Sequence, residues 1–168
     1  SKVLIEQLVE LLEKRHYSNL RPATLAAYRC YWKNDVLPAI GHRRVCDIQR
    51  GEIIELLAPI KGPKSNRILQ MLKSAFNQAE IWDLRPENSN PCRRIKPQPE
   101  RMRIRYLTEQ ELKDLMDACD TPGLTAERWR FTRLIKLLLL TGARLNEIKM
   151  ARWDWLDEKK AILKIGRA

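Results

Sequence analysis

The sequence predicts a mainly α-helical protein of two domains, with a short antiparallel β-ribbon near the end of the chain. Apolar residues recur at helical spacing through residues 1–90, and again from about residue 109 to residue 140. A proline-containing, strongly basic segment separates these two stretches. The chain has 168 residues, of which 44% are hydrophobic, so it can form a packed core and is not an intrinsically disordered chain.

Residues 1–90 are expected to form a bundle of four helices. The first helix covers 3–15, with leucines on one face. The second begins near Pro22, since proline suits a first helical turn, and ends at Pro38. The third covers about 51–58, and the fourth runs from about Pro63 to Trp82 with an apolar stripe made of Ile68, Leu69, Leu72, Ala75, Phe76 and Ala79.

Residues 91–105 are interpreted as an extended basic linker between the two domains. The segment holds six basic residues and one acidic residue, and its three prolines disfavour a regular helix. The whole chain has a net charge of +11, so nearly half of the excess lies in these fifteen residues. Concentrated charge on an extended segment favours contact with a polyanion over an ordinary solvated linker.

Residues 106–168 are expected to form a second, incomplete domain. Thr108 and Glu111 match a capping box, which predicts a helix from residue 109. A longer, buried helix follows over about 126–140, and Gly142 suits the left-handed position after its end. A short helix at 144–151 precedes two strands, 153–157 and 161–165, and the chain stops just after the second strand. The residues expected to be buried here are Leu112, Leu115, Met116, Trp129, Trp153 and Trp155, and Tyr106 is expected to pack at the domain boundary.

Composition excludes several classes of protein. No apolar run approaches the ~18 residues that span a bilayer, and no signal-peptide pattern begins the chain. The four cysteines lie far apart without a close pair, so no zinc or other metal site is expected, and we expect reduced thiols in a cytoplasmic protein. The positive charge makes nucleic acid, or an anionic membrane surface, the leading partner class.

The most informative local string covers residues 137–148. A helix ends at a glycine turn, Arg144 then begins a short helix, and Glu147 follows one turn later. The planar guanidinium of an arginine held there suits bidentate contact with a phosphate, and Glu147 is placed to orient it. On spacing alone, the pattern is more often an ordinary exposed Arg–Glu pair on a helix.

The string Thr141-Gly142-Ala143-Arg144-Leu145-Asn146-Glu147-Ile148 resembles the first catalytic-arginine motif of the tyrosine recombinases, the phage-integrase family. Weaker similarities to lambda-type integrases fall in the same order along nearly the whole chain, at residues 24–28, 37–41, 65–82, 90–105, 106–112 and 151–157.

The resemblance implies a core-binding (SAM-like) helical bundle followed by the first part of a mixed α/β catalytic domain. It implies site-specific recombination of double-stranded DNA, for integration or excision of a mobile element or prophage, through a 3′-phosphotyrosine intermediate and without a cofactor. Arg144 matches the first catalytic arginine, which grips the scissile phosphate, and Glu147 matches the acidic residue of the same motif. Family members act as tetramers on paired sites; for this chain we expect a monomer, associated with the nucleoid and not with a membrane.

The chain departs from the family pattern after Arg144. The family's further lysine, its His-Xaa-Xaa-Arg motif and its nucleophilic tyrosine all follow the first arginine. Here both histidines, His16 and His42, precede it, as do the four tyrosines at positions 17, 28, 31 and 106. This polypeptide is therefore expected to bind DNA without cleaving it.

Two groups of residues are predicted to contact DNA. One lies on the polar face of the fourth helix, where the resemblance favours placement along a groove of the duplex: Lys64, Asn66, Arg67 and Lys73. The other belongs to the basic linker, where cations contact phosphates without reading sequence: Arg93, Arg94, Lys96, Arg101, Arg103 and Arg105.

Two other functions remain open on the sequence. The chain is alternatively a non-catalytic DNA-binding module, such as a truncated regulator of a full-length enzyme. A helical protein–protein adaptor, whose charge serves only solubility, is the third reading and predicts weak DNA binding that does not depend on the linker arginines.

Overall fold

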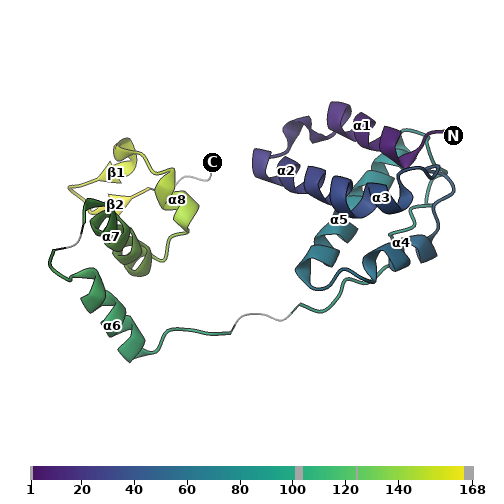
Figure 1. Cartoon of the computed structure of the whole chain (residues 1–168). Coiled ribbons are helices and arrows are strands. Elements are labelled where there is room, and N and C mark those ends of the chain that lie inside the picture. The colour runs from purple at the N-terminus through teal and green to yellow at the C-terminus, as the bar shows by residue number, and fades with distance from the viewer. Residues whose placement is uncertain (1, 101–103, 124, 165–168) are drawn as a thin grey trace. The chain divides into compact units, whose positions relative to one another are not determined.

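The computed structural model describes residues 2–100, 104–123 and 125–164. The chain divides into two compact units, Ser1–Met102 and Arg103–Ala168 (Figure 1). The fold is mainly helical with one small two-stranded antiparallel sheet, which confirms the predicted class at this level. Arg101, Arg103 and the end of the second predicted strand lie outside the described residues.

The first unit is built around one long helix. Its α-helices are α1 (Ile5–Arg15), α2 (Pro22–Tyr31), α3 (Leu37–Ile40), α4 (Arg50–Leu57) and α5 (Pro63–Ile81). Helices α1, α2 and α4 pack against α5. The stripe predicted on α5 is buried, because Ile68, Leu72, Ala75, Phe76 and Ala79 are at most 1% exposed. These side chains join those of the other helices in one hydrophobic core.

The second predicted helix does not end at Pro38, so that prediction is wrong. A π-type turn, Trp32–Val36, connects α2 to α3 and carries the helical path to Ile40. In this wider turn the N–H of Leu37 donates to the oxygen of Trp32, five residues earlier. Proline cannot donate the usual i→i−4 bond, and the shift in register lets the chain pass it. The helix ends at Gly41, where an added Cβ would lie 2.6 Å from the oxygen of Leu37.

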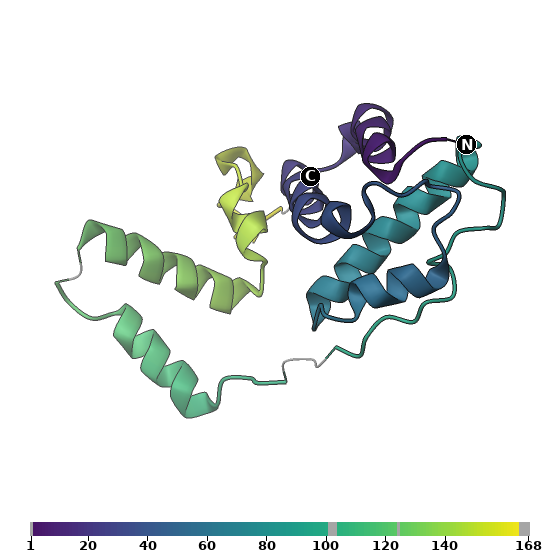
Figure 2. The ribbon, with the colours of Figure 1, turned by 45° about the vertical axis from the view of Figure 1, so that its right-hand side comes forward.

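The chain after α5 turns back along that helix in the opposite direction (Figure 2). We call residues 90–100 the strap. Asn90 is 4% exposed and donates from Nδ2 to the oxygen of Lys73 at 2.9 Å and to Oδ1 of Asn77 at 2.7 Å. Cys92 is fully buried, so the first part of the segment that the sequence predicts as an extended linker is packed onto the helical unit.

The second unit contains helices and a short two-stranded β-ribbon. Its elements are α6 (Glu109–Cys119), α7 (Ala126–Thr141), α8 (Leu145–Lys149), a 3₁₀ turn (Trp153–Trp155), β1 (Leu156–Asp157) and β2 (Ile162–Leu163). Leu156 pairs with Leu163 and Asp157 with Ile162 in antiparallel register. The capping box of α6 is confirmed, since Thr108 Oγ1 accepts from the N–H of Glu111 at 3.2 Å. The strands are shorter than predicted, because residues 153–155 form the 3₁₀ turn.

The described part of the second unit has almost no buried core. Cys119 is its one buried residue, whereas Trp153 is 88% exposed and Tyr106 82% exposed. The predictions that Trp129, Trp153 and Leu112 are buried, and that Tyr106 packs at the boundary, are wrong here. Three helices and two strands of two residues each offer too few elements to enclose a core. The prediction that α7 is a buried helix is also wrong, because none of its residues is buried, although residues 134–140 are apolar apart from Lys136.

Candidate nucleic-acid interface

Arg144 lies just after the turn that ends α7. Gly142 follows the helix with φ 65°, as predicted, and its N–H donates to the oxygen of Leu138 at 2.9 Å. This left-handed position suits glycine, and it ends α7 and redirects the chain into α8. Thr141 stabilises this turn, because its Oγ1 donates to the oxygen of Leu137 at 2.6 Å and accepts from the N–H of Ala143 at 3.3 Å. Arg144 is thereby the residue immediately before α8.

Glu147 holds the backbone and the side chain of Arg144. Its Oε2 accepts from the N–H of Arg144 at 2.8 Å, and its Oε1 lies 3.4 Å from a terminal guanidinium nitrogen. The Arg144 side chain is 87% exposed. Since Glu147 engages one edge of the guanidinium weakly, the other N–H groups remain open to an incoming phosphate. The arrangement can therefore bind an anion, although an exposed pair alone adds little stability.

The tyrosine side chains of the first unit pack in or against its core, so they are not placed as exposed nucleophiles. Tyr17 is buried, and its hydroxyl oxygen accepts from Nε1 of Trp32 at 3.1 Å. Burial raises the pKa of Tyr17 to about 12, so its phenolate forms less readily than that of an exposed tyrosine. Tyr28 and Tyr31 are half-buried against the core, as expected. Burial likewise raises the pKa of the Cys92 thiol to about 12, which disfavours its nucleophilic thiolate form.

A groove of about 680 Å³ lies between α5 and the strap. Three of the predicted DNA contacts line it, namely Asn66, Arg67 and Lys73. From the strap, Ile95, Pro97, Gln98 and Glu100 form the opposite wall. The structure thus places residues about thirty positions apart in the sequence on two sides of one surface.

The predicted cations differ in how freely they can meet a phosphate. Three of them already have acidic partners: Lys64 with Asp35 at 2.7 Å, Arg93 with Glu80 at 3.7 Å, and Arg105 with Glu111 at 2.5 Å. Four are exposed and have no carboxylate within 4 Å among the described residues, namely Arg67, Lys73, Arg94 and Lys96. These four are the stronger candidates for contacts with a polyanion.

The side chain of Asn66 is hydrogen-bonded to the strap. Its Nδ2 donates to the oxygen of Gln98 at 2.8 Å and to Glu100 Oε1 at 2.7 Å, and its Oδ1 accepts from the N–H of Gln98 at 2.7 Å. Gln98 adds a bond from Nε2 to the oxygen of Ile60 at 3.3 Å. Gln98 was not predicted from the sequence, because no local signal marks a contact that spans 32 positions. Asn66 therefore holds the strap beside α5.

Replacing Asn66 with alanine is expected to release the end of the strap without unfolding the helical unit. The exchange rate of the Gln98 amide hydrogen should rise about tenfold, the equivalent of ~1.4 kcal/mol for the lost hydrogen bonds. Hydrogen exchange followed by NMR measures this rate. Gln70→Ala is the matched control, since Gln70 lines the same groove and is exposed. Unchanged protection of Gln98 in Asn66→Ala would show that the strap is held by other contacts.

The described residues hold neither a candidate metal site nor a helix that could cross a membrane. No group of three or more His, Cys, Asp or Glu side chains lies close enough there to hold a metal ion. In the same part of the chain, no helix combines the length and apolar character needed to cross a membrane.

Known proteins offer no further guide to this arrangement. Comparisons with protein-family models, curated proteins and solved structures found no match to this chain.

Proposed function

We propose that this chain is part of a tyrosine recombinase that acts on double-stranded DNA. In this proposal the first unit is a core-binding domain, and the second unit is the start of the catalytic domain. The whole enzyme would integrate or excise a mobile element through a 3′-phosphotyrosine intermediate. The observation that carries the proposal is the turn after α7, where Gly142 redirects the chain and the Arg144 guanidinium is exposed beside Glu147.

Arg144 would bind the scissile phosphate in this enzyme. Its planar donors match two phosphate oxygens, and a positive charge held there stabilises the extra negative charge of the transition state. Glu147 would act as a positioning residue, because it accepts from the backbone N–H of Arg144 and approaches one edge of its side chain. No metal or organic cofactor forms part of this mechanism.

The first unit would bind the sugar–phosphate backbone with the four cations on α5 and the strap that have no acidic partner in the described part of the chain. Contacts of this kind supply affinity and set the position of the protein on the duplex, while base contacts supply sequence specificity. Arg67 and Lys73 line the groove, and Arg94 and Lys96 belong to the strap that forms its other wall, so binding would draw on both elements. An adaptor function would give these four cations no special role.

The test is the salt dependence of duplex binding. The full chain is titrated into a fluorescently labelled duplex at several salt concentrations, and anisotropy reports the association constant. In the test variant, alanine replaces all four cations: Arg67, Lys73, Arg94 and Lys96. The plot of log K against log salt should become shallower, its negative slope shrinking in magnitude by about 3 to 4, since each lost phosphate contact contributes about 0.9.

The control removes the same charge from elsewhere in the first unit. Lys2, Lys14, Lys33 and Arg50 are exposed, do not line the groove and can be replaced together. In this control the magnitude of the slope should shrink by about 1 or less, because only the long-range attraction between the protein and the DNA is weakened. Equal losses in the two quadruple variants, or no measurable binding by the original chain, would contradict the proposed interface.

A further inference from the structure

The strap is firmly packed at its beginning and weakly held at its end. Asn90 and Cys92 are buried, and Ile95 packs against the core of the helical unit. By contrast, every residue from 97 to 100 is exposed. The end of the strap therefore gains little from burial, and its hydrogen bonds decide whether it stays beside α5.

The side chain of Asn66 makes most of these hydrogen bonds. Gln98 lies between two prolines, which have no backbone N–H, so it carries the one backbone donor of residues 97–99. Asn66 accepts from that N–H and donates to the oxygen of Gln98, as a neighbouring strand would, and it also donates to Glu100. A further bond joins Gln98 to the oxygen of Ile60 at 3.3 Å. One side chain of α5 thus holds an exposed segment in place.

This segment lies beside the face of α5 that the proposed function assigns to DNA. Asn66, Arg67 and Lys73 line the groove of about 680 Å³, and Gln98 and Glu100 line it from the strap. A helix with its side chains is about 10–12 Å across, and the major groove of DNA is about 12 Å wide. An extended segment bonded to the side of a helix adds about 5 Å to that width. This face of α5 therefore does not fit a major groove while the end of the strap stays in place.

Glu100 adds an electrostatic obstacle. It is the one acidic residue within residues 91–105, and Asn66 holds its carboxylate in the groove that Arg67 and Lys73 also line. A phosphate that approaches these two cations meets a like charge there, which weakens the attraction. Moving Glu100 away from α5 would remove that repulsion.

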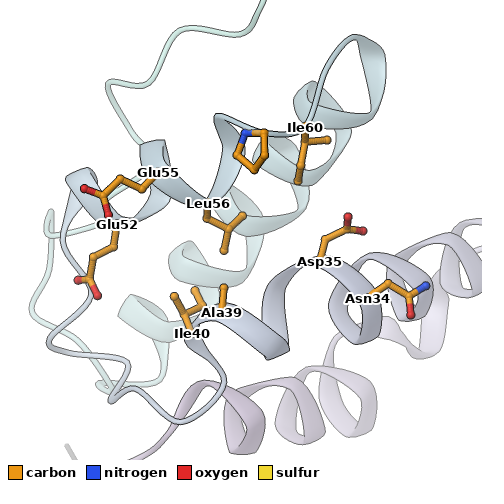
Figure 3. Close-up of a pocket in the computed structure, with 9 residues that line it drawn as sticks. Asn34, Asp35, Ala39, Ile40, Glu52, Glu55, Leu56 and Ile60 are labelled. Atoms are coloured by element: carbon orange, nitrogen blue, oxygen red, sulfur yellow. The ribbon is translucent and has the colours of Figure 1, made fainter.

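A second groove of the helical unit is unsuited to a polyanion. It has a volume of about 630 Å³ and lies between α4 and the stretch that joins the π-type turn to α3. Asp35, Glu52 and Glu55 line it, and its lining contains no lysine or arginine (Figure 3). Phosphates are repelled by such a surface. Of these two grooves, the one beside the strap is therefore the one that a duplex can use.

We propose that the end of the strap, residues 97–100, is an autoinhibitory latch on the DNA-binding face of α5. In the free chain Asn66 holds Gln98 and Glu100 beside that face. In the complex with a duplex, residues 97–100 leave it, while the packed part of the strap stays in place. The inference rests on the proposed function and adds a contact that DNA must break. The apparent affinity for DNA is then reduced by the fraction of chains in which the latch is open.

The first test measures the affinity of the full chain for the same labelled duplex at one low salt concentration. Asn66→Ala opens the latch and should tighten binding about three- to tenfold, up to the tenfold change expected for exchange of the Gln98 amide. If Asn66 instead contacted DNA directly, its loss would weaken binding. Unchanged or weaker binding by Asn66→Ala, in a chain that binds the duplex through its four cations, would overturn the latch and leave the proposed function intact.

A pair of charge-matched variants tests the part played by Glu100. Glu100→Gln keeps an oxygen that can accept from Asn66 but removes the negative charge, and it should tighten duplex binding about two- to fivefold. Glu10→Gln removes an exposed carboxylate on α1, outside the groove, and should change the affinity less than about 1.5-fold. Equal gains in the two variants would show that the position of Glu100 in the groove has no effect, against the proposal.

The second test follows the latch itself by hydrogen exchange and NMR, in the free chain and in the chain saturated with duplex. The exchange rate of the Gln98 amide should rise about tenfold in the complex. The Cys92 amide is the internal control, because its N–H donates to Oδ1 of Asn90 at 2.8 Å in the packed part of the strap, and its protection should not change. Unchanged or slower exchange of Gln98 in the complex would overturn the latch, whereas a chain that binds no duplex would overturn the proposed function as well.

Discussion

Replacing Arg85 with methionine should lower the free energy of unfolding of the helical unit by about 3 kcal/mol. Arg85 is 7% exposed, and its guanidinium donates to three backbone oxygens, those of Val45, Ile48 and Ser89. The same group lies 5.4 Å from the centre of the Phe76 ring. Methionine keeps much of the packing but leaves buried carbonyl groups without donors, which is the dominant loss.

Urea denaturation followed by circular dichroism at 222 nm and by tryptophan fluorescence measures the effect. Arg94→Met is the matched control, because Arg94 is exposed and has no acidic partner among the described residues. Its unfolding free energy should change by less than about 0.5 kcal/mol. If both variants unfold at the same urea concentration, the hydrogen bonds of Arg85 do not stabilise the loop at residues 45–48.

In a recombinase that carries this segment together with its nucleophilic tyrosine, Arg144→Ala should reduce strand cleavage by about 10³-fold or more. The estimate corresponds to ~4 kcal/mol, the upper part of the range for one preorganised donor to a developing negative charge. Duplex affinity should change less than about threefold, because one exposed cation is a small part of the phosphate contacts. A suicide DNA substrate that traps the covalent intermediate measures the cleavage rate.

Two further variants separate charge from geometry. Arg144→Lys keeps the positive charge but loses the planar pair of donors, so its cleavage should fall close to that of the alanine variant. Arg152→Ala removes an exposed arginine of the same unit, which pairs with Asp154 at 3.0 Å, and should cleave normally. Full cleavage by Arg144→Ala would remove this residue from the catalytic assignment.

Local sequence signals predicted most of the helix ends. Pro22 and Pro63 begin α2 and α5, Thr108 caps α6, and Gly142 takes the left-handed position after α7. Each signal acts through atoms within about four residues of itself, so it can be recognised without the rest of the fold. The same reasoning placed Arg144 and Glu147 one turn apart, as the structure has them.

Burial in the second unit was predicted poorly. Helical periodicity identified α7, but it gave no information on how many neighbours that helix has. Trp129 and Trp153 remain exposed because the described elements of this unit do not surround them. Apolar character shows that a residue gains from burial, whereas its actual burial depends on the elements packed around it.

By itself, the sequence determined the helical class, the positive charge, the helix caps and the local pairing of Arg144 with Glu147. Only the tertiary structure decided that Asn66 holds the strap, that Arg85 is buried over the loop at residues 45–48, and which cations are free of acidic partners. The contact of Asn66 with Gln98 joins residues 32 positions apart, and that of Arg85 with Val45 joins residues 40 positions apart. Their formation depends on the path of the folded chain, because side-chain donors and backbone acceptors at that separation meet only after the helices have packed.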